Sequence, residues 1–169
     1  MEKILMVGLV IAGLLGIMNA HAMSIADFDG NAITDAADVD LLTTEIVTGT
    51  NDSSFDVNND SVVDLSDLDA WFPIYSTDNG GVPDVSTAKV DINFDLSNTL
   101  ADFLVIQNNQ SLASSLFTSG DINADGVVNG LDITRYLSLG GVVPLPPALW
   151  LFGSGLLGLI GIAGKKAAK

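Results

Sequence analysis

The sequence predicts a mainly α-helical protein built from four loop–helix units, with an apolar segment at each end of the chain. Three observations support this class: an acidic twelve-residue segment recurs four times, a stretch with helical apolar periodicity follows each copy, and both chain ends are almost wholly apolar. Internal repetition indicates that one structural unit is used several times. The 169 residues suffice for one domain or two small ones.

Residues 1–22 have the three parts of a secretory signal peptide. Lys3 supplies a positive start, residues 4–18 are apolar, and residues 20–22 (AHA) form a small-x-small cleavage site. Cleavage after Ala22 would remove His21, the single histidine. The alternative is a retained membrane anchor.

Residues 142–169 also have three parts. A proline motif is followed by an apolar stretch at 148–164 and by a basic tail at 165–169. The apolar stretch is somewhat short against the roughly 20 residues that span a bilayer. Lys165 and Lys166 favour a cytoplasmic tail with the acidic body outside, and a permanent single-pass anchor is the alternative. The motif consists of Val143, Pro144, Leu145, Pro146 and Pro147.

The body between the two ends is strongly acidic. Twenty of the 21 acidic residues lie there, against only Lys89 and Arg135, and the body has neither cysteine nor histidine. Nucleic acid is excluded as a partner because phosphate binding needs a basic face. Catalytic sets of the Ser-His-Asp or Cys-His kind are excluded as well. A two-carboxylate glycosidase is the alternative, but most of the carboxylates have the regular spacing described next, so we expect a protein that is not an enzyme.

The four acidic segments share one spacing. They start at Asp27, Asp56, Asp91 and Asp121, and each has Asp at position 1, Asp or Asn at positions 3 and 5, and Asp at position 12. Fourteen of the acidic residues fall at positions 1, 3, 5, 9 or 12. Diffuse surface acidity would not keep this register. Local Asp/Asn turns remain the alternative reading.

This is the ligand spacing of the EF-hand calcium loop, in which oxygens come from positions 1, 3, 5, 7, 9 and 12, with a backbone carbonyl at position 7. The sequence therefore predicts up to four Ca²⁺ ions. The predicted ligands are Asp27, Asp29, Asn31, Ile33, Asp35 and Asp38; Asp56, Asn58, Asp60, Val62, Asp64 and Asp67; Asp91, Asn93, Asp95, Ser97, Thr99 and Asp102; and Asp121, Asn123, Asp125, Val127, Asn129 and Asp132.

Position 6 distinguishes the copies. Gly126 supplies the glycine that the loop favours, whereas Ala32, Ser61 and Leu96 stand in the other three. Leucine is strained at positive φ. We therefore expect the loop at 91–102 to bind calcium weakly or not at all.

The predicted helices follow the loops. They cover residues 35–49, residues 65–75 with a stop at Pro73, residues 99–107, and residues 131–139 with a stop at the next two glycines. Before the loops, residues 50–55 and 84–90 are expected to be extended or irregular, and only 111–120 can hold a preceding helix.

Two packing expectations concern the core. Trp71, Phe72 and Tyr75 are predicted to be core residues, with a ligand-binding aromatic patch as the alternative. Position 8 is expected on a short strand shared by paired loops. There Val63 would suit Thr34, whereas Val128 would fit Asn98 poorly.

The loop-then-helix unit with Asp at position 12 resembles type I dockerin repeats. The resemblance implies repeat pairs at 24–75 and 89–141, a linker at 76–88 and calcium-dependent folding. It does not imply cohesin binding, because positions 10 and 11 lack the usual Ser-Thr type pair. Arg135 is also the only basic residue in these predicted helices.

The stretch 143–166 resembles the VPLPA variant of PEP-CTERM sorting signals. Pro147 departs from the usual alanine. The resemblance implies export in a Gram-negative bacterium, an inner-membrane intermediate, processing by an exosortase, and release to the cell surface or matrix. Two functions remain: a calcium-stabilised structural or interaction protein with a surface protein or polysaccharide partner, and a calcium-dependent docking module that recruits a cohesin-like or other protein.

Overall fold

The computed structural model describes residues 24–143, 152 and 154. The expected signal peptide and Pro144, Leu145, Pro146 and Pro147 of the sorting motif lie outside these residues. None of the described helices has the length and apolar character needed to cross a membrane.

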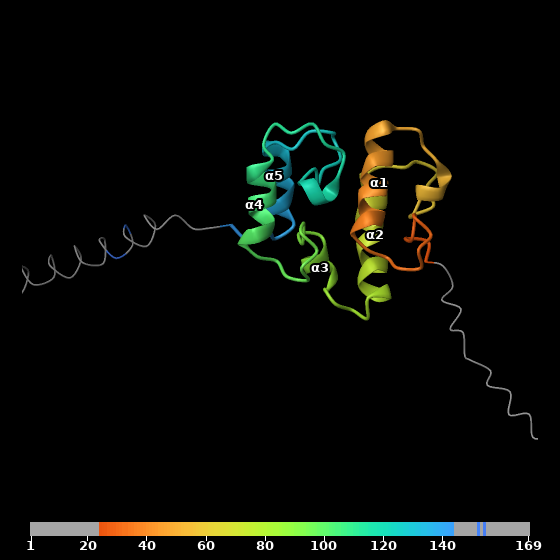
Figure 1. The fold of residues 1–169 in the computed structure, drawn as a ribbon, viewed down its shortest axis with the longest axis horizontal. Helices are drawn as coiled ribbons and strands as arrows, with labels where there is room; N and C mark the ends of the chain where they lie inside the picture. Colours follow the sequence, from red (N-terminus) through yellow and green to blue (C-terminus); the bar gives the residue numbers. More distant parts are fainter. Residues whose placement is uncertain (1–23, 144–151, 153, 155–169) are drawn as a thin grey trace, which may run out of the picture.

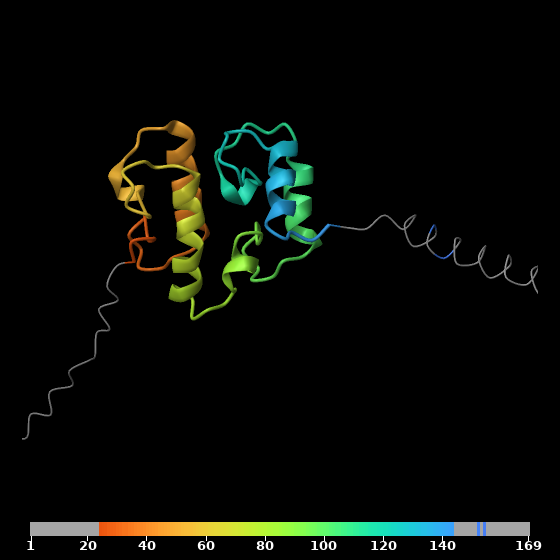
Figure 2. The same cartoon turned by 180° about the vertical axis from the view of Figure 1, so that it is seen from behind.

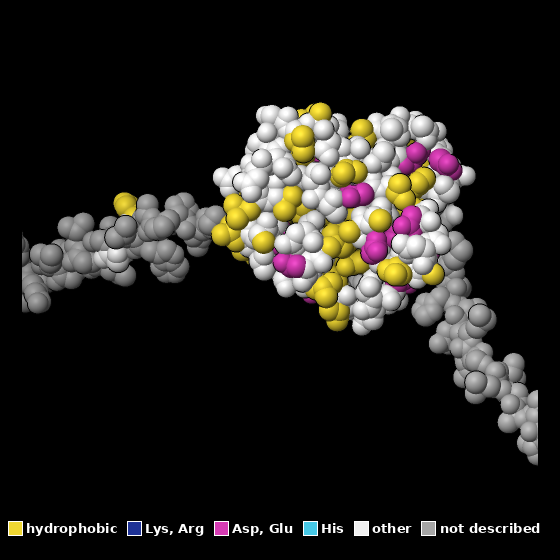
Figure 3. All heavy atoms as spheres, in the orientation of Figure 1, with side chains coloured by type: hydrophobic (Ala, Val, Ile, Leu, Met, Phe, Trp, Pro, Cys, Tyr) yellow, Lys and Arg dark blue, Asp and Glu magenta, His cyan; other side chains and the backbone are white. Residues whose placement is uncertain are grey.

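The described body is all-α, as predicted, and consists of two helix pairs that stand side by side (Figures 1 and 2). The first and last residues of the body lie on opposite sides of the molecule (Figure 1). On the face shown in Figure 3, most of the visible acidic side chains lie over the half that holds α1 and α2, and fewer lie over the half that holds α4 and α5. The first pair is α1 (Ala36–Thr48) and α2 (Leu65–Asp78), the second is α4 (Leu100–Asn108) and α5 (Gly130–Ser138), and the short α3 (Val85–Ala88) lies between the pairs.

Helix α1 forms where the sequence predicts it. The Asp35 side chain accepts the Ala37 N–H at 2.8 Å and so caps the helix start. Gly49 ends the helix in the left-handed conformation, with φ of 67°. Val39 and Leu42 are fully buried and direct one face of the helix into the core.

Helix α2 does not stop at Pro73, and this prediction is wrong. The helix continues to Asp78 although proline lacks the N–H that would bond one turn back. Trp71 and Phe72 before the proline and Tyr75 after it are all buried. Packing on both sides of Pro73 therefore outweighs the local cost of about 3 kcal/mol.

Short helical turns precede three of the loops, contrary to part of the prediction. Residues 50–55 contain the 3-10 turn η1 (Ser53–Phe55), and residues 84–90 contain α3. Both helical turns follow an aspartate cap, because Asp52 accepts the Ser54 N–H and Asp84 accepts the Ser86 N–H. Residues 111–120, where a helix was allowed, contain the 3-10 turn η2 (Phe117–Ser119).

The two halves share one aromatic cluster. The Phe72 and Phe117 ring centroids are 5.4 Å apart, and Phe94 lies 5.4 Å from Tyr75 and 6.2 Å from Phe117. Trp71 is completely buried, and its indole N–H donates to the Ala26 carbonyl at 3.0 Å. The aromatic residues of α2 are therefore core residues, as predicted, and do not form an exposed ligand patch.

Candidate metal centre

Each acidic segment runs directly into the first turn of a helix. Position 9 is the N-cap, and position 12 is the third helical residue, whose carboxylate reaches back to the N-cap amide in a capping box. The spacing thus serves helix initiation and loop closure together. The four position-9 and position-12 pairs are Asp35 with Asp38, Asp64 with Asp67, Thr99 with Asp102, and Asn129 with Asp132.

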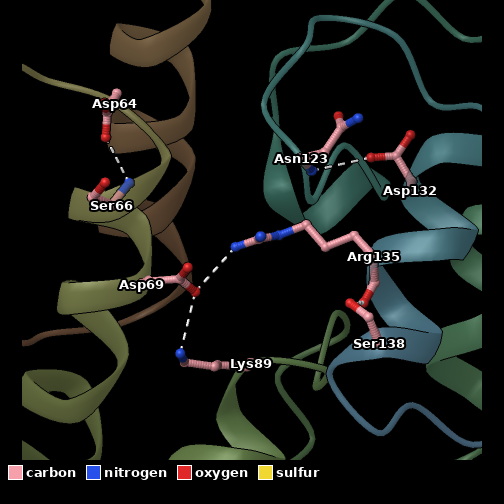
Figure 4. A network of polar contacts seen from close by, with 8 residues as sticks. All are labelled: Asp64, Ser66, Asp69, Lys89, Asn123, Asp132, Arg135 and Ser138. Carbon is pink, nitrogen blue, oxygen red and sulfur yellow. Dashed lines mark hydrogen bonds and ion pairs between the residues drawn. The ribbon is translucent and has the colours of Figure 1, made fainter.

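The position-12 aspartates have the same partners in all four loops. In the loop at 121–132, one oxygen of Asp132 accepts the Ile122 and Asn123 N–H groups at 2.9 and 3.1 Å, and the other accepts the Asn129 N–H at 2.8 Å. Figure 4 shows the Asn123 contact. The side chains are buried in every copy, and Asp38, Asp67 and Asp102 make the equivalent three bonds.

The position-1 aspartates close the other side of each loop. Asp121 accepts the Asp125 N–H at 3.1 Å and the Gly126 N–H at 2.9 Å. Backbone amides therefore turn both end carboxylates of the twelve-residue segment toward its interior. The same pair of bonds is made by Asp27, Asp56 and Asp91.

Positions 4 and 6 bend the backbone in the same way in every loop. At position 6 the φ angles are 68° for Ala32, 73° for Ser61, 70° for Leu96 and 86° for Gly126. The left-handed conformation aims the position-6 N–H at the position-1 carboxylate. Leu96 occupies the strained region expected for it, at a cost of about 1–2 kcal/mol. Position 4 also has positive φ, at Gly30, Asn59, Phe94 and Ala124.

Two groups of three aspartates can hold a metal ion. Asp27, Asp29 and Asp38 bring one carboxylate oxygen each to within 4.8 Å of one another. Asp121, Asp125 and Asp132 do the same. In the described loops at 56–67 and 91–102, no such group of three forms.

The two triads use different middle ligands. The loop at 27–38 supplies Asp29 from position 3, and the loop at 121–132 supplies Asp125 from position 5. In each triad the middle aspartate is exposed and the other two are buried. A metal ion would therefore be reached from the exposed side while the buried carboxylates bind it from within.

Burial makes the negative charge of these sites costly. It raises the pKa of Asp121 to about 6, against the hydrogen bonds from the Gly126 and Asp125 amides. It raises the pKa of Asp91 to about 6 in the same way, and it also raises the pKa of Asp38 and Asp132. Neighbouring carboxylates add to the rise at all four residues. A bound cation would stabilise the charged form that burial disfavours.

The predicted ligands at positions 7 and 9 have local partners. The Asn129 amide donates to the Val127 carbonyl at 3.0 Å, and its oxygen accepts the Leu131 N–H at 2.7 Å. Ile33, Val62, Ser97 and Val127 each donate their N–H to the side chain at position 5. Metal ligation by these two positions stays a prediction.

The shared strand expected at position 8 is not formed within the described residues. Val128 exchanges backbone hydrogen bonds with residues 111 and 112, the connector that follows α4. The Val63 N–H donates to the Asn51 side chain, in the connector after α1. Asn98 bonds instead to the Gly140 carbonyl and the Val142 N–H, in the segment that follows α5. These contacts at position 8 therefore join each loop to a segment that follows a helix of the same half.

The acids outside the predicted ligand positions have structural partners that the sequence did not reveal. The Asp69 carboxylate forms ion pairs with Lys89 at 3.2 Å and with Arg135 at 3.0 Å, so both basic residues of the body converge on it (Figure 4). Asp78 accepts the Thr34 hydroxyl at 2.7 Å. These partners are distant in sequence, and periodicity gives no signal for them. Glu45 accepts the Asp52 N–H, and Asp40 accepts Thr118.

Comparison with protein-family models finds no match for the chain, and no curated protein or solved structure matches it either.

Proposed function

We propose that the protein is an exported, calcium-binding, non-enzymatic surface or matrix protein whose loops form two pairs of EF-hand-like, dockerin-like repeats. The two aspartate triads carry this proposal. Each gathers three carboxylate oxygens within 4.8 Å inside a twelve-residue loop whose backbone amides already orient the two end carboxylates.

Calcium fits this donor set better than other common metals. The candidate ligands are carboxylate, amide and carbonyl oxygens, and the body offers neither histidine nor cysteine. Ca²⁺ takes six to eight such oxygens in flexible geometry, whereas zinc and copper prefer nitrogen and sulfur. The loops at 56–67 and 91–102 keep the same hydrogen bonds, which supports up to four ions with the two triads as the strongest sites.

The first prediction concerns calcium removal. An excess of calcium at about 100 times Kd should stabilise the full-length protein by about 2.7 kcal/mol per site relative to EDTA. Differential scanning calorimetry measures this difference. Coincident traces in calcium and EDTA would rule out the proposed function.

Matched variants show which residues carry the stabilisation by calcium. Asp29→Asn and Asp125→Asn each remove one exposed carboxylate from a triad and should each reduce the stabilisation. Asp52→Asn is the control, because asparagine caps η1 as well as aspartate does. It removes an equal charge outside the loops and should leave the calcium effect unchanged.

The export part of the proposal rests on the composition of the two ends. Expression in an exosortase-carrying bacterium should yield a surface or matrix form that lacks residues 1–22 and ends near the motif at 143–147. Intact-mass measurement of that form checks both cuts. A full-length product retained in the inner membrane would favour a permanent anchor instead.

A docking module is the second candidate, and exposed apolar side chains in the loops favour it. Ile33, Val62 and Val127 occupy position 7 of three loops, and each is at least 39% exposed. Capture of a protein partner should then require calcium and be weakened by Ile33→Ser together with Val127→Ser. Capture that is equally strong with and without calcium would count against this candidate.

A further inference from the structure

We propose that the metal centres at 27–38 and 121–132 are coupled through one face of α1, so that calcium at either centre tightens calcium binding at the other. This inference rests on the proposed function. It concerns centres in different halves of the chain, whereas the loops within each half share no strand among the described residues.

The coupling face begins at Asp40. One oxygen of Asp40 accepts the Thr118 N–H at 2.9 Å, and the other accepts the Thr118 hydroxyl at 2.6 Å. Asp40 lies two residues after Asp38, which is both a triad member and the third residue of α1. Thr118 lies in η2, three residues before Asp121 of the other triad.

Two more contacts continue along the same face. Thr44 and Val47 follow Asp40 at spacings of four and seven residues, which places all three on one side of a helix. The Thr44 and Ser115 hydroxyls are 3.2 Å apart. Val47 lies against Gly126, where an added Cβ would stand 3.2 Å from the Val47 Cγ1 atom. Helix α1 thus contacts the segment before the second centre and also the loop itself.

The segment between Thr118 and Asp121 has little freedom to absorb a shift. Gly120 has φ of 102°, and an added Cβ would stand 3.0 Å from the Ile106 Cα atom and 3.3 Å from the Val128 side chain. Figures 1 and 2 show η2 held between the second helix pair and α1. A movement of the α1 start on metal binding would therefore reach Asp121 through these contacts.

The experiment is a calcium titration of the full-length protein followed by amide NMR. The Ala32 N–H bonds to Asp27 and the Gly126 N–H bonds to Asp121, so each amide reports one centre. Asp125→Asn disables the second centre and should weaken calcium at the first by about fivefold or more, within the usual range for coupled sites. Asp29→Asn should weaken the second centre by the same factor, because coupling is reciprocal.

Thr118→Val removes the hydroxyl contact to Asp40 without changing either triad. In this background, Asp125→Asn should change the midpoint of the Ala32 amide by a smaller factor than in the wild-type background, because the Thr118 N–H, Thr44 and Val47 contacts remain. Thr77→Val is the control, since that hydroxyl bonds only to the Pro73 carbonyl of its own helix. It should leave the fivefold effect intact. If Thr118→Val does not fold, Asp40→Ala replaces it, because alanine accepts neither Thr118 bond.

The outcomes separate this inference from the proposed function. Two amides that titrate with calcium but stay independent in the wild-type background overturn the coupling and leave calcium binding in place. The same conclusion follows if Thr118→Val retains the full effect. Amides that do not respond to calcium overturn both proposals.

Discussion

At the scale of single residues, position 6 sets the conformational cost of each loop. The left-handed backbone there directs one N–H to the position-1 carboxylate, and only Gly126 adopts it without a side-chain penalty. Ala32, Ser61 and Leu96 keep the same conformation and the same hydrogen bond. The surrounding hydrogen bonds therefore determine the backbone here, and residue preference modulates its cost.

A glycine exchange tests this cost. Gly126→Ala should lower the free energy of unfolding by about 1–2 kcal/mol, because alanine is unfavourable at φ of 86° and its Cβ would press on Val47. Gly130→Ala should have the opposite sign and raise it by up to about 1 kcal/mol, since Gly130 begins α5 and an added Cβ meets no atom within 4 Å. Urea denaturation in EDTA measures both. Equal effects of the two exchanges would contradict this account.

The buried loop carboxylates predict a pH dependence with a definite sign. The pKa values of Asp91 and Asp121 are about 6 in the folded protein, above the unfolded value of about 3.9. Without metal, their contribution to stability is therefore present below about pH 4 and is lost as pH rises through 6. Thermal unfolding in EDTA should show a falling melting temperature over this range. Asp121→Asn should make this fall in melting temperature shallower. An unchanged profile in the variant would count against the raised pKa of Asp121 as its cause.

At the scale of elements, α2 shows how tertiary packing overrides a local stop signal. Pro73 removes one backbone bond, yet buried aromatic residues on both sides keep the helix continuous to Asp78. The loop–helix units, by contrast, follow local rules, because position 9 caps each helix and position 12 completes the capping box.

Replacement of Pro73 measures how much the proline lowers the stability of α2. Pro73→Ala should raise the free energy of unfolding by about 2 kcal/mol, which is the helix penalty of proline less the entropy that proline removes from the unfolded chain. Thr77→Ala is the comparison, since it removes a hydroxyl bond to the Pro73 carbonyl and keeps the ring. A destabilised Pro73→Ala protein would show instead that the proline shapes α2 for its packing.

The sequence was sufficient for the parts that local spacing controls. The helices after the loops, the strained Leu96 and the buried Trp71 were predicted, because capping, turns and apolar periodicity act over a few residues. Three other features were not predicted, because each depends on segments far away in the chain. They are the path of α2 beyond Pro73, the contacts at position 8 and the two partners of Asp69. The lack of a compact triad in the described loop at 56–67 also lay beyond prediction, because this loop has Asp at positions 1, 5 and 12 as the loop at 121–132 does.

At the scale of the whole molecule, the two halves are joined by shared aromatic rings and by the polar contacts of α1 and Asp69. The segment 76–88, expected as a linker, contains the end of α2 and all of α3, and its Ser76 and Ala88 are buried. Such an arrangement favours unfolding of both halves together.

A core substitution tests this joint stability. Phe117→Ala removes a buried ring of the second half and should lower the free energy of unfolding by about 3–5 kcal/mol. Amide hydrogen exchange should then accelerate in α1 as much as in α5. Exchange that accelerates only in α4 and α5 would indicate that the halves unfold separately.

The convergence of Lys89 and Arg135 on Asp69 has a consequence outside the molecule. Both cations have less than a quarter of their side-chain surface exposed, so they do little to offset the acidic exterior of residues 24–143. Neighbouring copies on one surface would repel each other at low ionic strength. At physiological salt this repulsion is screened over about 8 Å. The distance between adjacent molecules in a dense layer would then depend on the salt content of the medium.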